Sequence, residues 1–381
     1  MKKKLVVHLA ETPLAGAPIR IVNALNEYSE FQARLINYNP KCYGTRTFPE
    51  DIDWNDETKS VFAMDLIRKA DIFHIYHPIQ VDSVENVFGI NFVEINPTAK
   101  FLYQFESNKK HFCQQKIDYI DTMRYYKSVI IHYPERDFIG YPNLPNIIDL
   151  ETECLKPKDT KNKIPVVFYS PSSPHGVACN RWNSKGKPEV LKALRMIQRK
   201  VDFEIRLVEN TPYEECMQIK RDSDIVIDDI TTGSFHLSAL EGLSMGKPTI
   251  SFLDGRSVAV CSALTGSRDL PFVNVRLREL EKPLLMLLRD KSLRENVGEY
   301  SRYWMETYYN TQRNVGIYED LYSRVLSAGE GVGIELGEKA YLQAKEFLYR
   351  EVNDFIWGDY FSREINKQAV IKRLKFWKPK L

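Results

Sequence analysis

A single stretch, residues 231–251 (TTGSFHLSALEGLSMGKPTIS), constrains the fold more than any other part of the chain. It begins with small polar residues suited to a turn and a helix N-cap, and leucines spaced three residues apart then give one face of a helix. Gly246 ends that helix, and Lys247-Pro248 leads into a short apolar strand. Because residues 224–230 (DIVIDDI) predict a strand before the turn, the order is strand, turn, helix, strand. This is the repeating unit of a parallel α/β sheet.

The unit also predicts where a ligand binds. Ligands of open parallel sheets lie beyond the carboxyl ends of the strands. The start of the predicted helix therefore faces a cleft, where its unpaired N–H groups and positive dipole end suit a phosphate group. Glu241 lies two turns into the helix, within reach of a sugar hydroxyl. An ordinary helix of a doubly wound domain is the alternative interpretation of this stretch taken alone.

The stretch resembles the donor-site signature of retaining glycosyltransferases with the GT-B fold, in the large family-4-like group (glycosyl transferases group 1). Their pattern is Glu-(Gly-Phe-Gly-Leu)-x3-Glu-Ala-(small)-x-x-Gly-x-Pro-Val. Here residues 234–237 (SFHL) occupy the Gly-Phe-Gly-Leu positions, Glu241 the second Glu, and residues 246–248 the end. The resemblance implies that Glu241 holds the ribose of a nucleotide. Gly233 replaces the first Glu, which in the family contacts the donor sugar, so the chain departs from the pattern there.

Length and composition limit the possible classes of protein. The 381 residues are enough for two α/β domains with cores of their own. The chain has 43% hydrophobic and 27% charged residues, typical of a soluble globular protein, and a net charge of +2, which gives no indication of nucleic-acid binding. Its six scattered cysteines include no Cys-x-x-Cys pair and indicate a reducing compartment. No apolar stretch is long enough to span a membrane, and the start of the chain does not resemble a signal peptide, so we expect a cytoplasmic protein.

The pattern of elements divides the chain into four parts. Residues 1–155 predict an acceptor-side Rossmann-like domain, and residues 164–310 predict a nucleotide-sugar-binding domain of the same kind. The charged run between them is the candidate linker. In the fold that the chain resembles, the last helices cross back to the first domain, which implies this path for residues 311–328. The expected fold class is therefore α/β, with two Rossmann-like parallel-sheet domains facing a cleft and an extra C-terminal helical tail over residues 329–381.

A loop of small residues follows the first predicted strand, residues 4–9 (KLVVHL). In the resembled family such a loop faces the cleft and lets the acceptor and the donor phosphate come close. The resemblance implies this role for Gly16 and Ala17. A plain turn between a strand and a helix fits these residues equally well.

The third predicted strand, residues 71–76 (DIFHIY), ends beside a histidine. Many family members carry a catalytic-site histidine at the close of a similar strand, near the 6-hydroxyl of the sugar. Strict alignment puts this position at Tyr76, one residue before His77, so we expect Tyr76 or His77 at the cleft as a catalytic residue. His74 is interpreted as a core histidine. Two histidines three apart on a strand do not converge on a metal ion.

A second basic element precedes the helix predicted from about residue 184 to residue 200. In the family an Arg-x(3–6)-Lys-Gly element clamps the donor diphosphate, and Arg181 and Lys185-Gly186 fit it by type and spacing. Arginine and lysine compensate the charge on a leaving diphosphate without a metal ion, so both are also candidate catalytic residues. The complete set of implied donor-binding residues is Arg181, Lys185, Gly233, Ser234, Phe235, His236, Leu237 and Glu241.

No metal or resident cofactor is expected. The run Asp222-Ser223-Asp224 is similar to the Asp-x-Asp manganese motif of the other glycosyltransferase fold. We interpret it instead as the end of a helix followed by the start of a strand. The nucleotide diphosphate sugar would be a substrate.

The end of the chain, from Arg363 to Leu381, carries seven basic residues and one acidic residue, interleaved with apolar side chains. Such a tail can lie on an anionic membrane surface, contact nucleic acid, or form a solvated helix that closes on the first domain. Low net charge argues against nucleic acid. Membrane contact would place the protein at the inner face of the membrane, where lipid-linked glycan acceptors occur.

These observations predict a retaining, metal-independent glycosyltransferase. It would move a sugar from a nucleotide diphosphate to a hydroxyl of a glycan, lipid-linked or protein acceptor. The family resemblance implies a same-face mechanism in which the leaving phosphate helps to deprotonate the acceptor. Two alternatives stay open: a sugar-nucleotide epimerase on the same fold, and a non-catalytic nucleotide-sugar-binding subunit.

Overall fold

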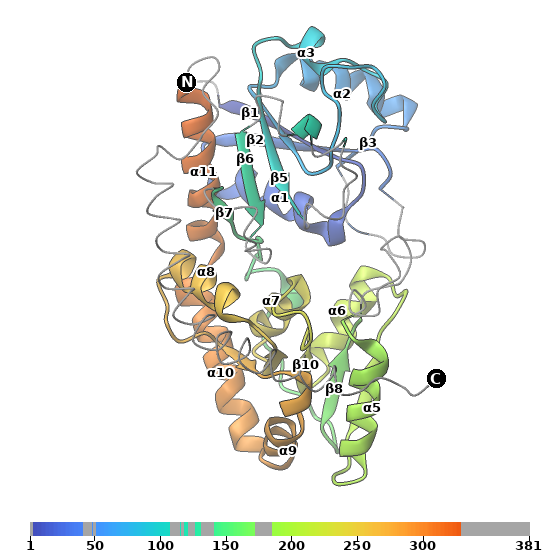
Figure 1. Ribbon diagram of the computed structural model, residues 1–381, viewed down its shortest axis with the longest axis vertical. Helices are drawn as coiled ribbons and strands as arrows, with labels where there is room; N and C mark the ends of the chain where they lie inside the picture. Colours follow the sequence, from blue (N-terminus) through green and yellow to red (C-terminus); the bar gives the residue numbers. More distant parts are fainter. Residues whose placement is uncertain are drawn as a thin grey trace, which may run out of the picture.

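The computed structural model describes residues 3–40, 48, 51–106, 115, 118–120, 126–130, 141–171 and 185–328. These residues form two parallel-sheet α/β domains, which occupy the upper and lower halves of Figure 1. The expected helical tail, residues 329–381, lies outside the described residues, and so does Arg181.

The first domain contains a seven-stranded sheet in the order β3-β2-β1-β4-β5-β6-β7, with every neighbouring pair parallel. Its strands are β1 (Lys4–Ala10), β2 (Phe31–Asn37), β3 (Ile52–Asp53), β4 (Ile72–Ile75), β5 (Lys100–Phe105), β6 (Tyr126–Ile130) and β7 (Asn143–Leu144). Its helices are η1 (Leu14–Gly16), α1 (Ala17–Tyr28), α2 (Glu57–Lys69) and α3 (Phe92–Ile95).

Alternation along the central strand β1 builds a core on each face of this sheet. Leu5, Val7 and Leu9 pack with α2 in one core, whereas Val6 and Ala10 pack with α1 in the other. Successive side chains of a strand point to opposite faces, so a central parallel strand is mostly apolar, and the buried His8 is the polar exception within β1.

The second domain contains a five-stranded parallel sheet in the order β12-β11-β10-β8-β9. Its strands are β8 (Val166–Tyr169), β9 (Glu204–Leu207), β10 (Ile225–Ile227), β11 (Thr249–Ser251) and β12 (Phe272–Asn274). Its helices are η4 (Glu153–Leu155), α5 (Lys187–Gln198), α6 (Tyr213–Arg221), α7 (Leu237–Ser244), α8 (Gly255–Thr265), η6 (Leu277–Glu279), α9 (Glu281–Arg289) and α10 (Lys291–Tyr308). The predicted class of two parallel-sheet α/β domains is confirmed.

The last described helix, α11 (Thr311–Ser327), leaves the second domain and packs on the first (Figure 1). Val315, Leu321 and Val325 are buried in the core that contains α1. The hydroxyl of Tyr318 donates a hydrogen bond of 2.8 Å to the carbonyl of Pro145. Helix α11, which follows the second domain in the chain, therefore completes the core of the first domain.

Candidate active site between the two domains

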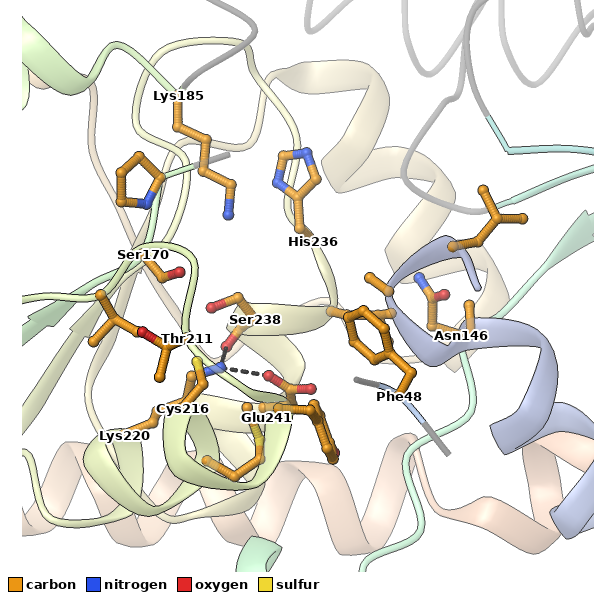
Figure 2. Close-up of a pocket in the computed structure, with 18 of the residues that line it drawn as sticks. Phe48, Asn146, Ser170, Lys185, Thr211, Cys216, Lys220, His236, Ser238 and Glu241 are labelled. Carbon is orange, nitrogen blue, oxygen red and sulfur yellow. Dashed lines mark hydrogen bonds and ion pairs between the residues drawn. The ribbon is translucent and has the colours of Figure 1, made fainter. Parts of the chain in front are cut away.

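A cavity of about 380 Å³ lies between the domains, where the carboxyl ends of both sheets meet. The first half of the chain contributes Leu14, Ala15, Ala17, Phe48, Glu106 and Asn146. The second half contributes Ser170, Pro171, Lys185, Val208, Thr211, Tyr213, Cys216, Met217, Lys220, His236, Leu237, Ser238 and Glu241. Figure 2 shows Phe48 and Asn146 on one side of this cavity and Lys185, Ser170 and Thr211 on the other.

Two consecutive aspartates after β10 shape the wall that belongs to the second domain. Asp229 accepts hydrogen bonds from the N–H groups of Thr231 (2.7 Å) and Thr232 (3.0 Å), which fixes the turn that the sequence predicts. Asp228 accepts the N–H of His236 at 2.8 Å. His236 is the N-cap of α7. The cap thus lies two residues after Ser234, the last of the small residues expected to cap the helix. Asp228 binds the N–H of His236 from outside the helix. The first turn of α7 thus lies at the cavity, as Leu237 and Ser238 line it.

Lys185 lies opposite this helix start, as predicted. Its backbone has a φ of 57° and that of Gly186 a φ of 66°, so the two residues form a left-handed turn before α5. A Cβ atom at Gly186 would lie 2.7 Å from the Thr231 side chain, so only glycine fits there. The turn aims the buried Nζ of Lys185 at Asp228 Oδ1, 2.6 Å away. Burial alone raises the pKa of the Asp228 carboxyl, but Lys185 and then His236 outweigh it and hold that pKa well below its usual range.

Glu241 also lines the cavity, but in the described structure both of its oxygens bind cations. Oε1 accepts a bond of 2.5 Å from Arg20 of α1, and Oε2 accepts from Nζ of Lys220 of α6 (Figure 2 shows the latter). Arg20 also donates to the hydroxyl of Tyr213 at 2.6 Å. Burial raises the pKa of Glu241, but Lys220 and Arg20 outweigh it, so the pKa is lowered and the carboxyl is ionised. The carboxylate of Glu241 therefore joins the two domains through Arg20. It is also the group that is expected to contact a ribose.

The loop after β1 approaches the cavity as predicted for Gly16 and Ala17. Ala17 lines the cavity together with Leu14 and Ala15. Gly16 has a φ of 79°, and a Cβ atom there would lie 3.2 Å from the ring of Phe48. Gly16 is not itself part of the lining, so its role is to allow the tight turn before α1.

The expectation that Tyr76 lies at the cleft is wrong. Tyr76 is 2% exposed, and its hydroxyl bonds Nδ1 of His8 at 2.7 Å in the core beneath α11. It shares a face of β4 with His74, and α11 covers that face. His77 points away, as alternation predicts: its Nδ1 accepts the N–H of Glu11 at 3.1 Å. His77 ties two loops near the cavity but is not part of the lining.

The structure explains why glycine occupies position 233. Gly233 has a φ of 93°, and a Cβ atom there would lie 3.1 Å from the side chain of Asp254. A glutamate at this position would therefore need a different backbone. Gly233 and Ser234 lie outside the cavity lining, and the Phe235 ring is buried against Phe272, 5.1 Å between ring centres. The ring of Phe235, one of the expected donor-binding residues, therefore belongs to the core and does not face the cavity.

Asp222 and Asp224 lie at the other end of the second sheet. Asp222 pairs with Lys158 at 2.5 Å, and Asp224 accepts a hydrogen bond from Nδ2 of Asn162 at 2.9 Å, so both hold the linker. Among the described residues, no group of three or more His, Cys, Asp or Glu side chains is arranged to hold a metal ion. Within the same residues, no helix is both long and apolar enough to cross a membrane.

Among the charged side chains at this site, sequence reasoning missed Glu106 and Lys220, which line the cavity, and Arg20, which bonds Glu241 beside it. Glu106 directly follows β5, at the edge where ligands of parallel sheets bind, and this position is the signal that identifies it. Arg20 and Lys220 carry no such signal, since each looks like a solvated charge on an amphipathic helix. The packing of α6 on α7 brings Lys220 to Glu241 within the second domain, and the packing of the two domains brings Arg20 there.

No protein-family model and no curated protein matches the sequence. Solved structures do match. A glycosyltransferase from Rickettsia africae has a TM-score of 0.57 and 13% identity, covering 86% of this chain and 100% of that one.

HepE from Anabaena, solved in complex with UDP, has a TM-score of 0.53 and 13% identity, covering 84% of this chain and 100% of its own. Sucrose-phosphate synthase from Thermosynechococcus elongatus has a TM-score of 0.50 and 11% identity, covering 86% and 100%. The full length of each of these proteins aligns across both domains. The chain therefore has the two-domain GT-B fold found in glycosyltransferases.

Proposed function

We propose that the protein is a glycosyltransferase that moves a sugar from a nucleotide diphosphate sugar to a hydroxyl acceptor, with retention of configuration. The observation that carries this proposal is the second-domain wall of the cavity. It combines a buried lysine, the N-terminus of α7 and an ionised glutamate in one space that also borders the first domain. The lysine and the helix N-terminus suit a diphosphate, and the carboxylate suits the hydroxyls of a ribose.

The proposed donor pose follows from the charges. The diphosphate would bind between Lys185 and the N–H groups of Leu237 and Ser238, which are the free donors of the first turn of α7. Ribose hydroxyls would donate to Glu241. A carboxylate has about four acceptor positions, so Glu241 can keep both cations and still accept from a ribose. The complexes of HepE with UDP, and with UDP and glucose, support a uridine nucleotide as the first to test.

The proposed chemistry needs charge compensation and positioning. The bond between the anomeric carbon and the phosphate oxygen breaks, and the acceptor oxygen forms its bond on the same face as its proton passes to the leaving phosphate. Lys185 compensates the charge that develops on that phosphate. We propose the same task for Arg181, four residues earlier in the chain. The residues that the cavity supplies can do this without a metal ion.

The acceptor is proposed to be a glycan, a lipid-linked glycan or a protein. The basic end of the chain, residues 363–381, would bring the enzyme to an anionic membrane surface. Deletion of these residues should reduce sedimentation with vesicles containing anionic lipid. An unchanged pellet would exclude membrane contact through this segment.

One observation favours a second function, that of a non-catalytic nucleotide-sugar-binding subunit. Gly233, at the position where the family pattern has a donor-sugar glutamate, packs against Asp254 outside the cavity. Tight nucleotide binding without turnover over a broad panel of donors and acceptors would support this alternative.

The first test is calorimetric titration with UDP, GDP, ADP and CDP. We expect one of them to bind with micromolar affinity, and Lys185→Ala to weaken that binding. Lys187→Ala is the matched control, because Lys187 lies two residues away and pairs with Glu209 at 2.5 Å instead of facing the cavity. No binding of any nucleotide, or equal losses in the two variants, would contradict the proposed donor site.

A further inference from the structure

Glu106 is a carboxyl group on the first-domain wall of the cavity. It directly follows β5, which lies between β4 and β6 in the first sheet, and it is half-buried. Lys185, His236 and Glu241 belong to the second-domain wall. A sugar attached to a diphosphate at Lys185 would lie in the cavity that Glu106 also lines.

A buried chain of hydrogen bonds orients this carboxyl. His74 Nδ1 bonds the hydroxyl of Tyr322 at 2.8 Å, and His74 Nε2 bonds Oε1 of Gln104 at 3.0 Å. The amide nitrogen of Gln104 then donates to Oε1 of Glu106. Because an amide oxygen only accepts, His74 must carry its proton on Nε2 and accept from Tyr322 through Nδ1. Every link of the chain is satisfied when His74 is neutral.

This series of hydrogen bonds uses only one oxygen of Glu106, so the other oxygen can contact a ligand. Gln104 occupies Oε1, so a proton on the carboxyl belongs on Oε2. No lysine or arginine among the described residues forms an ion pair with Glu106. Burial raises the pKa of Glu106 to about 8, although the bond from Gln104 opposes the shift. At pH 7 the group is therefore a neutral acid and a hydrogen-bond donor.

The buried tyrosines and the histidine near Glu106 do not change charge in the same range. Burial raises the phenol pKa values of Tyr76, Tyr103 and Tyr318, so these groups stay neutral, and it lowers the pKa of His74 to about 3. The charged or titratable groups that line the cavity with Glu106, interact with it electrostatically or join it through Gln104 are His74, Tyr76, Tyr103, Tyr318, Lys185, Tyr213, Cys216, Lys220, His236 and Glu241.

We propose that Glu106 is held as a neutral carboxylic acid whose Oε2 hydroxyl donates a hydrogen bond to a hydroxyl of the donor sugar, and that recognition of the sugar is lost when Glu106 ionises. This inference rests on the proposed function. It adds a sugar-binding residue from the first domain and a dependence on pH. A carboxylate accepts hydrogen bonds but cannot donate one, so ionisation removes the donor and adds a charge to the subsite.

Glu106→Gln is the matched variant, because a carboxamide has the shape of the neutral acid and does not titrate. Its oxygen can accept from Gln104 while its NH2 group faces the cavity. Infrared difference spectra between pH 7 and pH 9.5 should show loss of a protonated-carboxyl band in the native protein and not in Glu106→Gln. Absence of this band from the native protein overturns the inference.

The second measurement is the affinity of UDP-glucose relative to UDP, or of the glucose conjugate of whichever diphosphate binds. With a pKa of about 8, some nine-tenths of Glu106 is protonated at pH 7 and about 3% at pH 9.5, so this ratio should fall by up to about 30-fold in the native protein. In Glu106→Gln the affinity ratio of UDP-glucose to UDP should be the same at both pH values. In Glu106→Ala the contribution of the sugar to affinity should be lost at both pH values.

The outcomes separate the two proposals. Lys247, whose pKa burial lowers to about 8, lies at the other end of the second sheet and is present in every variant, so its titration cancels. If a nucleotide binds but the affinity ratio of UDP-glucose to UDP does not change with pH, the inference about Glu106 is overturned and the proposed function is not. The same conclusion follows if this ratio falls equally in the native protein and in Glu106→Gln. Absence of nucleotide binding overturns both proposals.

Discussion

The buried His74 makes the first domain sensitive to acid, and its replacement by glutamine should remove part of this sensitivity. His74 is fully buried and lies 4.8 Å, centre to centre, from the ring of His8. Burial lowers its pKa from 6.5 to about 3, and the bond with Gln104 offsets only part of that shift. Burial and the neighbouring His74 also lower the pKa of His8, whose Nε2 has no hydrogen-bond partner among the described residues.

The sign and size of the effect follow from linkage. The folded-state pKa of His74 is depressed, so the unfolded chain binds a proton first as the pH falls. The contribution to stability is therefore complete above pH 6.5 and is lost between pH 6.5 and about 3. At pH 5 the unfolded histidine is almost fully protonated and the folded one is not, which lowers the free energy of unfolding by about 2 kcal/mol relative to pH 8.

The assay compares native protein and His74→Gln in urea at pH 8 and pH 5, with pulse-labelling hydrogen exchange on peptides from β1 and β4. Reading these strands directly matters because the two domains need not unfold together. The substitution itself costs stability at both pH values, and that cost cancels in the difference between them. We expect the loss on acidification to be smaller by about 2 kcal/mol in the variant. Equal losses in both proteins would show that His74 is already protonated, or solvated, in the fold.

Three further predictions follow from close contacts. Glu241→Ala should lower the free energy of unfolding by about 3–5 kcal/mol in chemical denaturation, because it leaves the 1% exposed Lys220 and the guanidinium of Arg20 without a carboxylate, and adding Lys220→Met should recover only the part of that loss that is due to Lys220. Lys185→Met should weaken diphosphate binding in calorimetry by about 2 kcal/mol, the contribution of a buried charged hydrogen bond. Gly298→Ala should lower the free energy of unfolding by about 1–3 kcal/mol, since its Cβ would lie 2.2 Å from a backbone carbonyl, whereas Gly316→Ala, with nothing within 4 Å, should be neutral or stabilising.

Local patterns were sufficient to place Lys185, His236, Leu237 and Glu241 of the second domain at one cavity, whereas the predicted residues Gly233, Ser234 and Phe235 lie outside its lining. The turn at residues 231–234, the helix after it and the Lys185-Gly186 element are all set by residues close together in the chain. Asp228 and Asp229 complete them from the end of β10, and both are charged residues that end an apolar strand. The lysine, the helix start and Glu241 consequently line one cavity, as the sequence indicates.

Predictions failed where tertiary packing decides the outcome. The residues of segment 119–128 are compatible with a helix, but β6 begins at Tyr126, which pairs with Leu102 of β5. Aromatic residues fit a helix face and a strand almost equally well, so the neighbouring strand selects the structure. The prediction that Tyr76 lies at the cleft is wrong for a related reason. An aromatic residue at the end of a strand is compatible with a cleft, and only the return of α11 shows that its face is covered.

The ion pair of Arg20 with Glu241 shows why a site between two domains cannot be predicted in full from residues that are close together in the sequence. The two residues are 221 positions apart and belong to domains that each have a complete sheet of their own. Arg20 is one of several polar residues on an amphipathic helix, and its sequence neighbours give no sign of a partner. Yet its side chain is only 15% exposed, and burying a guanidinium without a carboxylate would be unfavourable by several kcal/mol. The arrangement of the domains is therefore favoured by the same carboxylate that the donor ribose would contact, and a substitution at Glu241 must alter the domain interface and the nucleotide site together.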